Sequence, residues 1–345
     1  MSPTFLISRT DAIGDVVLTL PVAGWLKQHY PACRVVLIGR SYTAAVSSAC
    51  PQLDDFLAID TLQKLPAAEQ LAQVRSYEAA AIIHVFPNKF LAKLARQANI
   101  PVRIGTRNRL FHWLACNRLV ALSRRHSPLH EAQLNLQLLQ PLGYSQVLSL
   151  AAIIALTGLR AATPLRAEYQ QLLAARQPGQ LNVVLHPRSR GSAREWGLPH
   201  FGELARLLHK AGHRVFISGT AAEGEELAGW LRENARFITA DLTGQLALPE
   251  FITFIAAADG LVAGSTGPLH LAAALGRQAL GLYPPIRPMH PSRWAPLGPH
   301  AEYLVVDRPN CQDCEAQPTE CTCIKAIAAA TVAAQIARWQ PLQAT

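Results

Sequence analysis

The stretch 259–285, DGLVAGSTGPLHLAAALGRQALGLYPP, constrains the fold of this chain more than any other part of its sequence. Short apolar runs at 261–264 and 279–283 are typical of buried strands, and the Ala- and Leu-rich segment 269–275 is typical of a helix. Ser-Thr-Gly-Pro at 265–268 supplies the residue types favoured at the cap and first turn of a helix. The stretch therefore predicts a βαβ unit of a parallel sheet.

The start of this helix predicts an anion site. Backbone N–H groups and the positive end of the helix dipole, placed at the carboxyl end of a parallel strand, attract phosphate. Gly267 lets an anion approach the backbone closely, and His270 can add a ring N–H or a positive charge. Ser265 and Thr266 complete the turn. The alternative is that these residues only cap a helix, because every doubly wound domain has several such turns.

Alternating strand and helix patterns along the chain predict two Rossmann-like halves, each a doubly wound parallel sheet, facing a central crevice. The expected strands are 5–8, 34–38, 56–59, 80–84, 102–105, 182–186, 214–218, 261–264 and 279–283. The expected helices are 14–30 with a kink at Pro21, 67–75, 89–98, 130–142, 200–211, 223–232, 249–258, 269–275 and 324–339. We place the domains at 1–162 and 163–323, followed by a C-terminal helix within 324–345. The absence of G-x-G-x-x-G and G-x-x-x-x-G-K-[ST] argues against a dinucleotide oxidoreductase and a P-loop enzyme.

Composition fits this interpretation. A length of 345 residues suits two domains, and 50% hydrophobic residues are ample for two cores. We expect a soluble cytosolic protein, because the N-terminus lacks a secretory signal and the longest apolar run, 147–156, is too short to span a bilayer. The seven cysteines are then expected to be reduced thiols.

The positive charge is concentrated in one stretch. No Asp or Glu occurs in 79–130, and its nine basic residues are Lys89, Lys93, Arg96, Arg103, Arg107, Arg109, Arg118, Arg124 and Arg125. Outside it, 32 minus 9 leaves 23 basic residues against 23 acidic ones, so the stretch carries the whole net charge of +9. Such a field favours a polyanionic partner, which could be nucleic acid, an anionic membrane surface or a phosphorylated substrate. The alternative is a solvated face.

Asp15 is the candidate general base. It follows Gly14 at the end of the first strand, where carboxylates at the carboxyl edge of a sheet often accept protons. A helix-capping role is the alternative. Arg188, Arg190 and Arg194 follow the strand 182–186, and such guanidinium groups can hold a pyrophosphate, although one or two of them could merely be solvated. Because the chain has no D-x-D pair, a metal-free mechanism fits better.

Three segments carry a family resemblance. TFLISRTDAIGDVVLTLPVAGWLKQHYP, then RIGTRNRLFHWL followed by HEAQLNLQLLQPLG, and GSTGPLHLAAALGR resemble the ADP-heptose:lipopolysaccharide heptosyltransferases of glycosyltransferase family nine, in the same order over nearly the whole chain. The resemblance implies a two-domain GT-B fold, an N-terminal domain that binds the acceptor, a C-terminal domain that binds the nucleotide sugar, and metal-independent inverting transfer. It also implies that the final helix packs back across the domains.

The resemblance also implies site residues. By similarity, Asp15 is the catalytic base, Thr266, Gly267 and His270 form the donor-phosphate site, and Glu223, Thr243 and Gly244 belong to the nucleotide-binding domain. With the arginines and Ser265, the expected donor site comprises Arg188, Arg190, Arg194, Glu223, Thr243, Gly244, Ser265, Thr266, Gly267 and His270. Within this set, Glu223 is expected at a ribose. Two positions depart from the family: Arg194 stands where a Lys is usual, and Ser265 stands where an Asp is usual, which leaves the transferred sugar open.

The expected substrates and location follow from the same resemblance. The donor is expected to be ADP-L-glycero-D-manno-heptose, with no cofactor required. The acceptor is expected to be an anionic glycolipid, the lipopolysaccharide inner core, contacted by Arg103, Arg107 and Arg109. We expect the protein in the cytoplasm, peripherally bound to the inner face of the inner membrane.

Other interpretations stay open at this point. Phe111 and Trp113 within the basic stretch would suit a nucleic-acid-binding module, although we expect no nucleic acid partner. A sugar-nucleotide epimerase of GT-B type would need a second acid/base group that the sequence does not reveal. Cys311, Cys314, Cys321 and Cys323 could hold zinc, but their spacing is unlike common zinc motifs and cytosolic thiols are often free.

Overall fold

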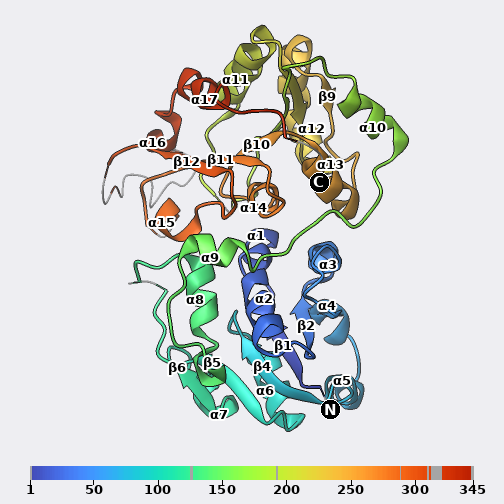
Figure 1. The fold of residues 1–345 in the computed structure, drawn as a ribbon, viewed down its shortest axis with the longest axis vertical. Helices are drawn as coiled ribbons and strands as arrows, with labels where there is room; N and C mark the ends of the chain where they lie inside the picture. The colour runs from blue at the N-terminus through green and yellow to red at the C-terminus, as the bar shows by residue number, and fades with distance from the viewer. Residues whose placement is uncertain are drawn as a thin grey trace. The chain divides into compact units, whose positions relative to one another are not determined.

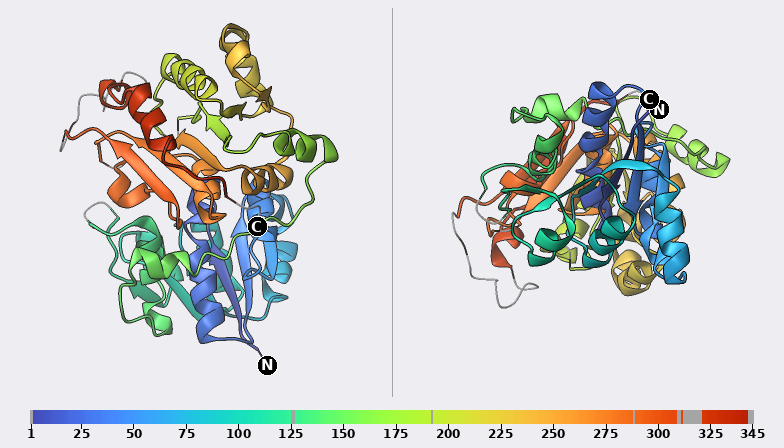
Figure 2. Two further views of the ribbon diagram at one scale, coloured as in Figure 1. Left: turned by 45° about the horizontal axis from the view of Figure 1, so that its top comes forward. Right: turned by 90° about the horizontal axis from the view of Figure 1, so that it is seen from below.

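The structure of the protein is a computed structural model, which describes residues 2–124, 127–191, 193–287, 289–308, 311 and 321–342. The chain divides into two compact units, Met1–Leu159 and Arg160–Thr345. Each unit contains one six-stranded sheet with helices packed on it (Figures 1 and 2). Within the described part of the chain, no helix combines the length and the apolar character needed to cross a bilayer.

The N-terminal sheet is entirely parallel, in the order β3-β2-β1-β4-β5-β6. Its strands are β1 (Thr4–Ser8), β2 (Arg34–Gly39), β3 (Asp55–Ala58), β4 (Ala79–His84), β5 (Val102–Thr106) and β6 (Arg118–Val120). The five expected strands are confirmed to within a residue or so at each end. The short edge strand β6 was not expected, because three residues leave almost no apolar pattern.

The helices of this unit lie between successive strands, except α8 and α9, which follow the last strand, β6. They are α1 (Ile13–Val17), α2 (Leu20–His29), α3 (Ala44–Ser48), α4 (Ile59–Leu62), α5 (Ala67–Arg75), α6 (Lys89–Gln97), α7 (Leu110–Ala115), α8 (Glu131–Gln137) and α9 (Leu150–Ile154), with 3-10 turns η1 (Ser41–Thr43) and η2 (Gln140–Leu142). The expected kink at Pro21 is wrong in position. The helix ends at Val17 and a new one begins at Leu20, so Pro21 lies in a first turn, where its missing N–H removes no hydrogen bond.

The C-terminal sheet repeats the topology, in the order β12-β11-β10-β7-β8-β9. Its strands are β7 (Asn182–His186), β8 (Arg214–Ile217), β9 (Ala240–Asp241), β10 (Gly260–Gly264), β11 (Gln278–Tyr283) and β12 (Ala301–Val305). The helices are α10 (Ala167–Ala174), α11 (Leu198–Lys210), α12 (Ala221–Asn234), α13 (Leu248–Ala257), α14 (Gly267–Ala274), α15 (Pro291–Trp294), α16 (Thr322–Lys325) and α17 (Ala329–Ile336), with the 3-10 turn η3 (Ala235–Phe237). The βαβ unit β10-α14-β11 is confirmed.

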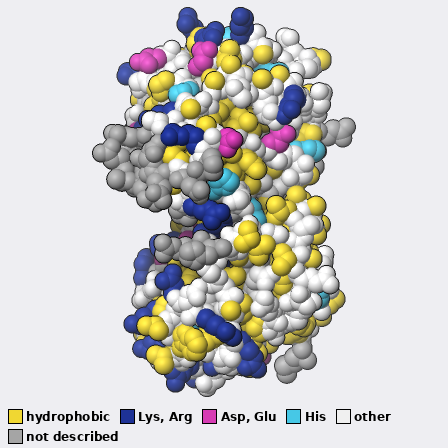
Figure 3. Space-filling model, turned by 90° about the vertical axis from the view of Figure 1, so that its left-hand side faces the viewer, with side chains coloured by type: hydrophobic (Ala, Val, Ile, Leu, Met, Phe, Trp, Pro, Cys, Tyr) yellow, Lys and Arg dark blue, Asp and Glu magenta, His cyan; other side chains and the backbone are white. Residues whose placement is uncertain are grey.

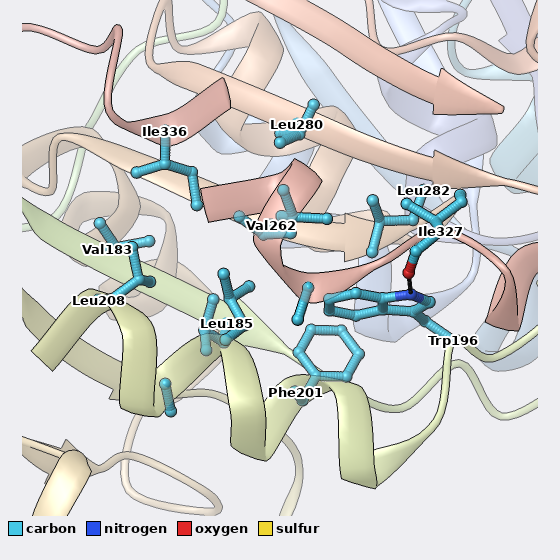
Figure 4. Packing of buried hydrophobic residues seen from close by; sticks show 14 of the residues in the cluster. Val183, Leu185, Trp196, Phe201, Leu208, Val262, Leu280, Leu282, Ile327 and Ile336 are labelled. Carbon is cyan, nitrogen blue, oxygen red and sulfur yellow. Dashed lines mark hydrogen bonds between the residues drawn. The ribbon is translucent and has the colours of Figure 1, made fainter. Parts of the chain in front are cut away.

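One core of the C-terminal unit lies between its sheet, α11 and α17 (Figure 4). Val183 and Leu185 of β7 pack there with Leu208 of α11 and Ile336 of α17. Trp196 is buried in the same core, and its Nε1 donates a hydrogen bond to the carbonyl oxygen of Ile327 at 2.8 Å. This bond fixes the end of the loop that follows β7.

Both sheets have the strand order 3-2-1-4-5-6 of a dinucleotide-binding fold when each is counted from its own first strand. The order reverses between β1 and β4 in one unit and between β7 and β10 in the other. Ligands of such sheets bind outside the carboxyl ends of the strands at this point of reversal. Residues 9–15, 187–197 and 265–270 follow β1, β7 and β10, so each of these loops lies at the ligand-binding edge of its own sheet.

Candidate active site

Asp15 lies in the first turn of α1, directly beyond the carboxyl end of β1. Its carboxylate is held by the guanidinium of Arg9 and remains 20% exposed. The hydroxyl of Thr19 donates to the backbone oxygen of Asp15 at 2.8 Å, which fixes the end of this short helix. The side chain is therefore both oriented and reachable, as a general base must be.

Arg9 is the centre of a buried charge network. In addition to Asp15, its Nε contacts Asp11 at 2.7 Å and its Nη1 contacts Glu131 at 3.1 Å. Burial opposes a charge here, but the three carboxylates raise the pKa of Arg9 above its usual value, so the guanidinium stays ionised. Burial, together with the nearby charge of Asp15, raises the pKa of Asp11 to about 6 despite the opposing effect of Arg9.

Glu131 and Asn135 of α8 tie this network to the rest of the domain. Glu131 is fully buried and also contacts Arg124 Nε at 3.0 Å. The Nδ2 of Asn135 donates to the Leu18 carbonyl at 3.0 Å, at the junction of α1 and α2. The sequence analysis missed this network, because 122 residues separate Arg9 from Glu131 and no local pattern links them.

The start of α14 has the form expected of an anion site. Thr266 is its N-cap residue but makes no side-chain cap hydrogen bond. The residue is only 5% exposed, and its Oγ1 has no hydrogen-bond partner among the residues that the structure describes. Because buried hydroxyl groups are usually paired, an oxygen of a bound anion would complete this site. Gly267 stays partly exposed at the helix start, and His270 is buried in the first turn.

The structure brings Arg194 next to this helix start. A Cβ on Gly264, the last residue of β10, would lie 3.3 Å from the Arg194 carbonyl oxygen, so the loop after β7 packs on the end of β10. Ser265 forms a hydrogen bond with Tyr283, whose pKa is raised by burial. The hydroxyl that replaces the usual acid is thus tied to the sheet.

The other expected donor residues gather beyond β8 and β9. Glu223 caps α12 by accepting from the Thr220 backbone N–H at 2.7 Å, and it lies 3.4 Å from Arg190. Thr243 and Gly244 join them, because the Gly244 N–H donates to the Gly219 carbonyl at 3.0 Å and its φ of +69° suits glycine. These residues form a second cluster within the same unit.

The arginines of the β7 loop are already bound to acids. Arg188 contacts Glu195 and Glu226, each at 3.0 Å, and Arg190 contacts Glu223. They are therefore not simply solvated. To hold a pyrophosphate, either would have to exchange a carboxylate for phosphate oxygens, and Arg194, further along the same loop, is buried.

The expected acceptor residues divide into two kinds. Arg103 donates to the carbonyl of Ala115 at 2.8 Å and to that of Ile100, so it ties α7 to the sheet. Arg107 and Arg109 are exposed at the start of α7.

The cysteine cluster can be described only in part, because Cys314 lies outside the described residues. Cys311 Sγ lies 3.4 Å from Cys323 Sγ, and Cys321 and Cys323 are buried. No group of three or more His, Cys, Asp or Glu side chains in the described ranges is arranged to hold a metal ion.

Two domains, each with a parallel six-stranded sheet and candidate ligand residues at the reversal of its strand order, are the architecture of the GT-B fold. Comparisons with known proteins agree. The profile of glycosyltransferase family 9 (heptosyltransferase) matches residues 73–324. The chain therefore belongs to this family and is a heptosyltransferase-like glycosyltransferase.

Similar proteins include a putative glycosyltransferase of Haemophilus influenzae, 26% identical over 302 residues and 85% of each chain. Lipopolysaccharide heptosyltransferase 2 of Salmonella typhimurium is 24% identical, with 82% of this chain and 83% of the relative covered. Among solved structures, the Escherichia coli ADP-heptose lipopolysaccharide heptosyltransferase II has a TM-score of 0.73 at 18% identity, and a family 9 glycosyltransferase from Veillonella parvula has 0.78 at 17%. Each covers 97% of both chains. These structures confirm the expected GT-B fold.

Proposed function

We propose that this protein transfers a heptose from ADP-L-glycero-D-manno-heptose to a hydroxyl group of the lipopolysaccharide inner core. The observation that carries the donor half of this proposal is the start of α14, where the buried Oγ1 of Thr266 lacks a partner among the described residues next to the partly exposed Gly267. Relatives named as lipopolysaccharide heptosyltransferases support the substrate pair. The acceptor is bound by the N-terminal domain and the donor by the C-terminal one.

In the proposed reaction, Asp15 accepts the proton of the acceptor hydroxyl while its oxygen attacks the anomeric carbon of the donor. The bond from that carbon to the phosphate oxygen breaks on the opposite side, so the configuration inverts and ADP leaves. Arg9 orients the Asp15 carboxylate through their ion pair. One bond to the anomeric carbon forms as the other breaks, so the reaction balances without a redox step or a cofactor.

The departing ADP carries the charge that the C-terminal domain must stabilise. The N–H groups at the start of α14, the Thr266 hydroxyl and the Arg194 guanidinium supply positive potential there. With this counter-charge and no D-x-D pair in the sequence, we propose that transfer needs no divalent metal. Glu223, Thr243 and Gly244 would then lie toward the nucleoside.

An anionic glycolipid acceptor implies work at the cytoplasmic face of the inner membrane. Arg107 and Arg109 are exposed and are proposed to contact the acceptor's phosphates or acidic sugars. Arg103 is proposed to act indirectly, through α7.

The test is a transfer assay with purified enzyme, lipopolysaccharide core acceptor and ADP-, UDP- and GDP-sugars, with and without EDTA. We expect turnover with ADP-heptose that EDTA leaves unchanged. Asp15→Asn should lower kcat by about 10²–10⁴, the usual cost of losing a general base, while ADP binding stays intact. An Asp15→Asn enzyme with half of wild-type turnover, or activity that returns only with Mg²⁺, would contradict the mechanism.

A further inference from the structure

Helix α7 carries three large apolar side chains that point into solvent. Leu110 is 88% exposed, Leu114 is 74% exposed and Trp113 is 59% exposed. Their spacing of three and four residues puts them on one face of the helix. The opposite face is fixed to the domain, because His112 is buried and its Nδ1 accepts a hydrogen bond from the Thr106 N–H at 3.0 Å.

The helix is held rigidly in this exposed position. Arg96 donates to the Leu114 carbonyl at 2.9 Å and Arg103 donates to the Ala115 carbonyl at 2.8 Å, so arginines satisfy carbonyls at its C-terminal end. The indole N–H of Trp113 donates to the Arg107 carbonyl at 2.9 Å. Because these donors and acceptors are already hydrogen-bonded within the protein, the apolar face can enter an apolar medium without burying any of them unpaired.

Six exposed basic residues, here called the basic rim, lie on or next to the elements that carry this face. Lys89, Lys93 and Arg96 are exposed at helical spacing on α6, which packs beside α7, and Arg107, Arg109 and Arg118 are exposed just before and after α7 in the chain. Among the described residues, none of these six forms an ion pair. Lys and Arg side chains gather around apolar ones at the lower end of the face in Figure 3.

We propose that α7 docks this protein on an anionic bilayer, with Leu110, Trp113 and Leu114 entering the interfacial region and the six basic residues contacting lipid headgroups. Apolar side chains beside a basic rim are what interfacial anchors present. A second copy of the chain is disfavoured as the occupant, because a two-fold contact would bring like charges together. The proposal deepens the proposed function, since it places the enzyme where a glycolipid acceptor resides.

The test is sedimentation of the full-length protein with vesicles that contain no lipopolysaccharide. Vesicles of phosphatidylethanolamine and phosphatidylglycerol should bind it, and phosphatidylcholine vesicles should bind it far less.

Leu110→Ser with Leu114→Ser should lower partitioning at least about tenfold, because apolar area no longer inserts. Arg107→Gln with Arg109→Gln should lower it about fivefold per charge at low salt. Tyr303→Ser and Lys210→Gln, at exposed positions in the C-terminal unit, are the matched controls.

The fluorescence of Trp113 reports directly on contact between α7 and lipid, because Trp113 is the most exposed of the six tryptophans. Lipids with quenchers at the interface should quench its emission, and Trp113→Phe should remove that response. Equal binding of the α7 variants and the controls would overturn the proposal. The proposal would also be overturned if the α7 substitutions left vesicle binding unchanged and instead abolished a concentration-dependent dimerisation. Tight RNA binding at physiological salt that the same substitutions abolish in place of vesicle binding would overturn it as well. Because no acceptor is present, failure here leaves the proposed transfer untouched, and failure of transfer leaves docking untouched.

Discussion

Arg9 is the residue on which the geometry of the N-terminal site depends. Its one planar guanidinium contacts Asp11, Asp15 and Glu131 through different nitrogens, which an ammonium group cannot reproduce. We expect Arg9→Lys to keep the charge but release the Asp15 carboxylate, lowering kcat about 100-fold because a general base out of place is nearly as costly as its loss.

Kinetic constants and ADP affinity distinguish loss of the Asp15 position from loss of folding. KM for acceptor and the affinity for ADP should change little in Arg9→Lys, and the protein should stay folded. Arg34→Lys is the matched control, because Arg34 forms an exposed ion pair with Asp55 in the same sheet. If both variants keep wild-type kcat, Arg9 does not position Asp15.

Asp11 should make the N-terminal domain less stable as pH rises. Its folded pKa is about 6 against an ordinary value of 3.8, so the folded state binds the extra proton between these values. Stability is then highest when Asp11 is protonated and falls by about 2–3 kcal/mol as pH rises through this window. Asp11→Asn still accepts a hydrogen bond from Arg9 and should remove this loss. The free energy of unfolding of the wild type and of Asp11→Asn, measured by denaturation across this pH window, checks the expectation. The same pH dependence in both proteins would refute it.

Among the elements, α14 allows a test of ligand binding without loss of fold. Thr266 makes no cap hydrogen bond and its hydroxyl has no partner in the described part of the chain, so Thr266→Val should cost little stability. If that hydroxyl binds a donor phosphate, its loss should weaken ADP binding about tenfold or more, the usual effect of a hydrogen bond to a charged group. Calorimetric titration of Thr266→Val and Thr266→Ser would show it. Unchanged affinity in the valine variant would exclude this contact.

Elements with a continuous apolar pattern were predictable from the sequence, and edge elements were not. Asn182–His186 is buried throughout and the structure has β7 at those bounds. Strand β12 was missed because Glu302 and Tyr303 face solvent at the sheet edge and interrupt its pattern. In the candidate site, the positions of the loops after β1, β7 and β10 could be predicted from chain order, because each loop directly follows the carboxyl end of a predicted strand. The partners Arg9 and Glu131 could not, since only the folded sheet and α8 bring them together.

At the scale of the whole molecule, each unit has its own parallel sheet and its own core. Ligands assigned to different units should therefore stabilise different unfolding transitions. The proposed donor residues all lie in Arg160–Thr345, whereas Asp11 and Asp15 lie in Met1–Leu159.

We expect two transitions in a calorimetric scan, of which ADP raises only one. At a concentration about a hundredfold above its Kd, ADP adds about 2.7 kcal/mol to the unit that binds it, which moves that Tm by about 5–10 °C. Thr266→Val should shrink this shift at the same ADP concentration, whereas Asp15→Asn should leave it intact. At neutral pH, Asp11→Asn should raise the other transition and so identify it as that of the N-terminal unit. A shift of the N-terminal transition by ADP would place the donor in the wrong domain, and a single transition moved by both changes would mean that the two units unfold together.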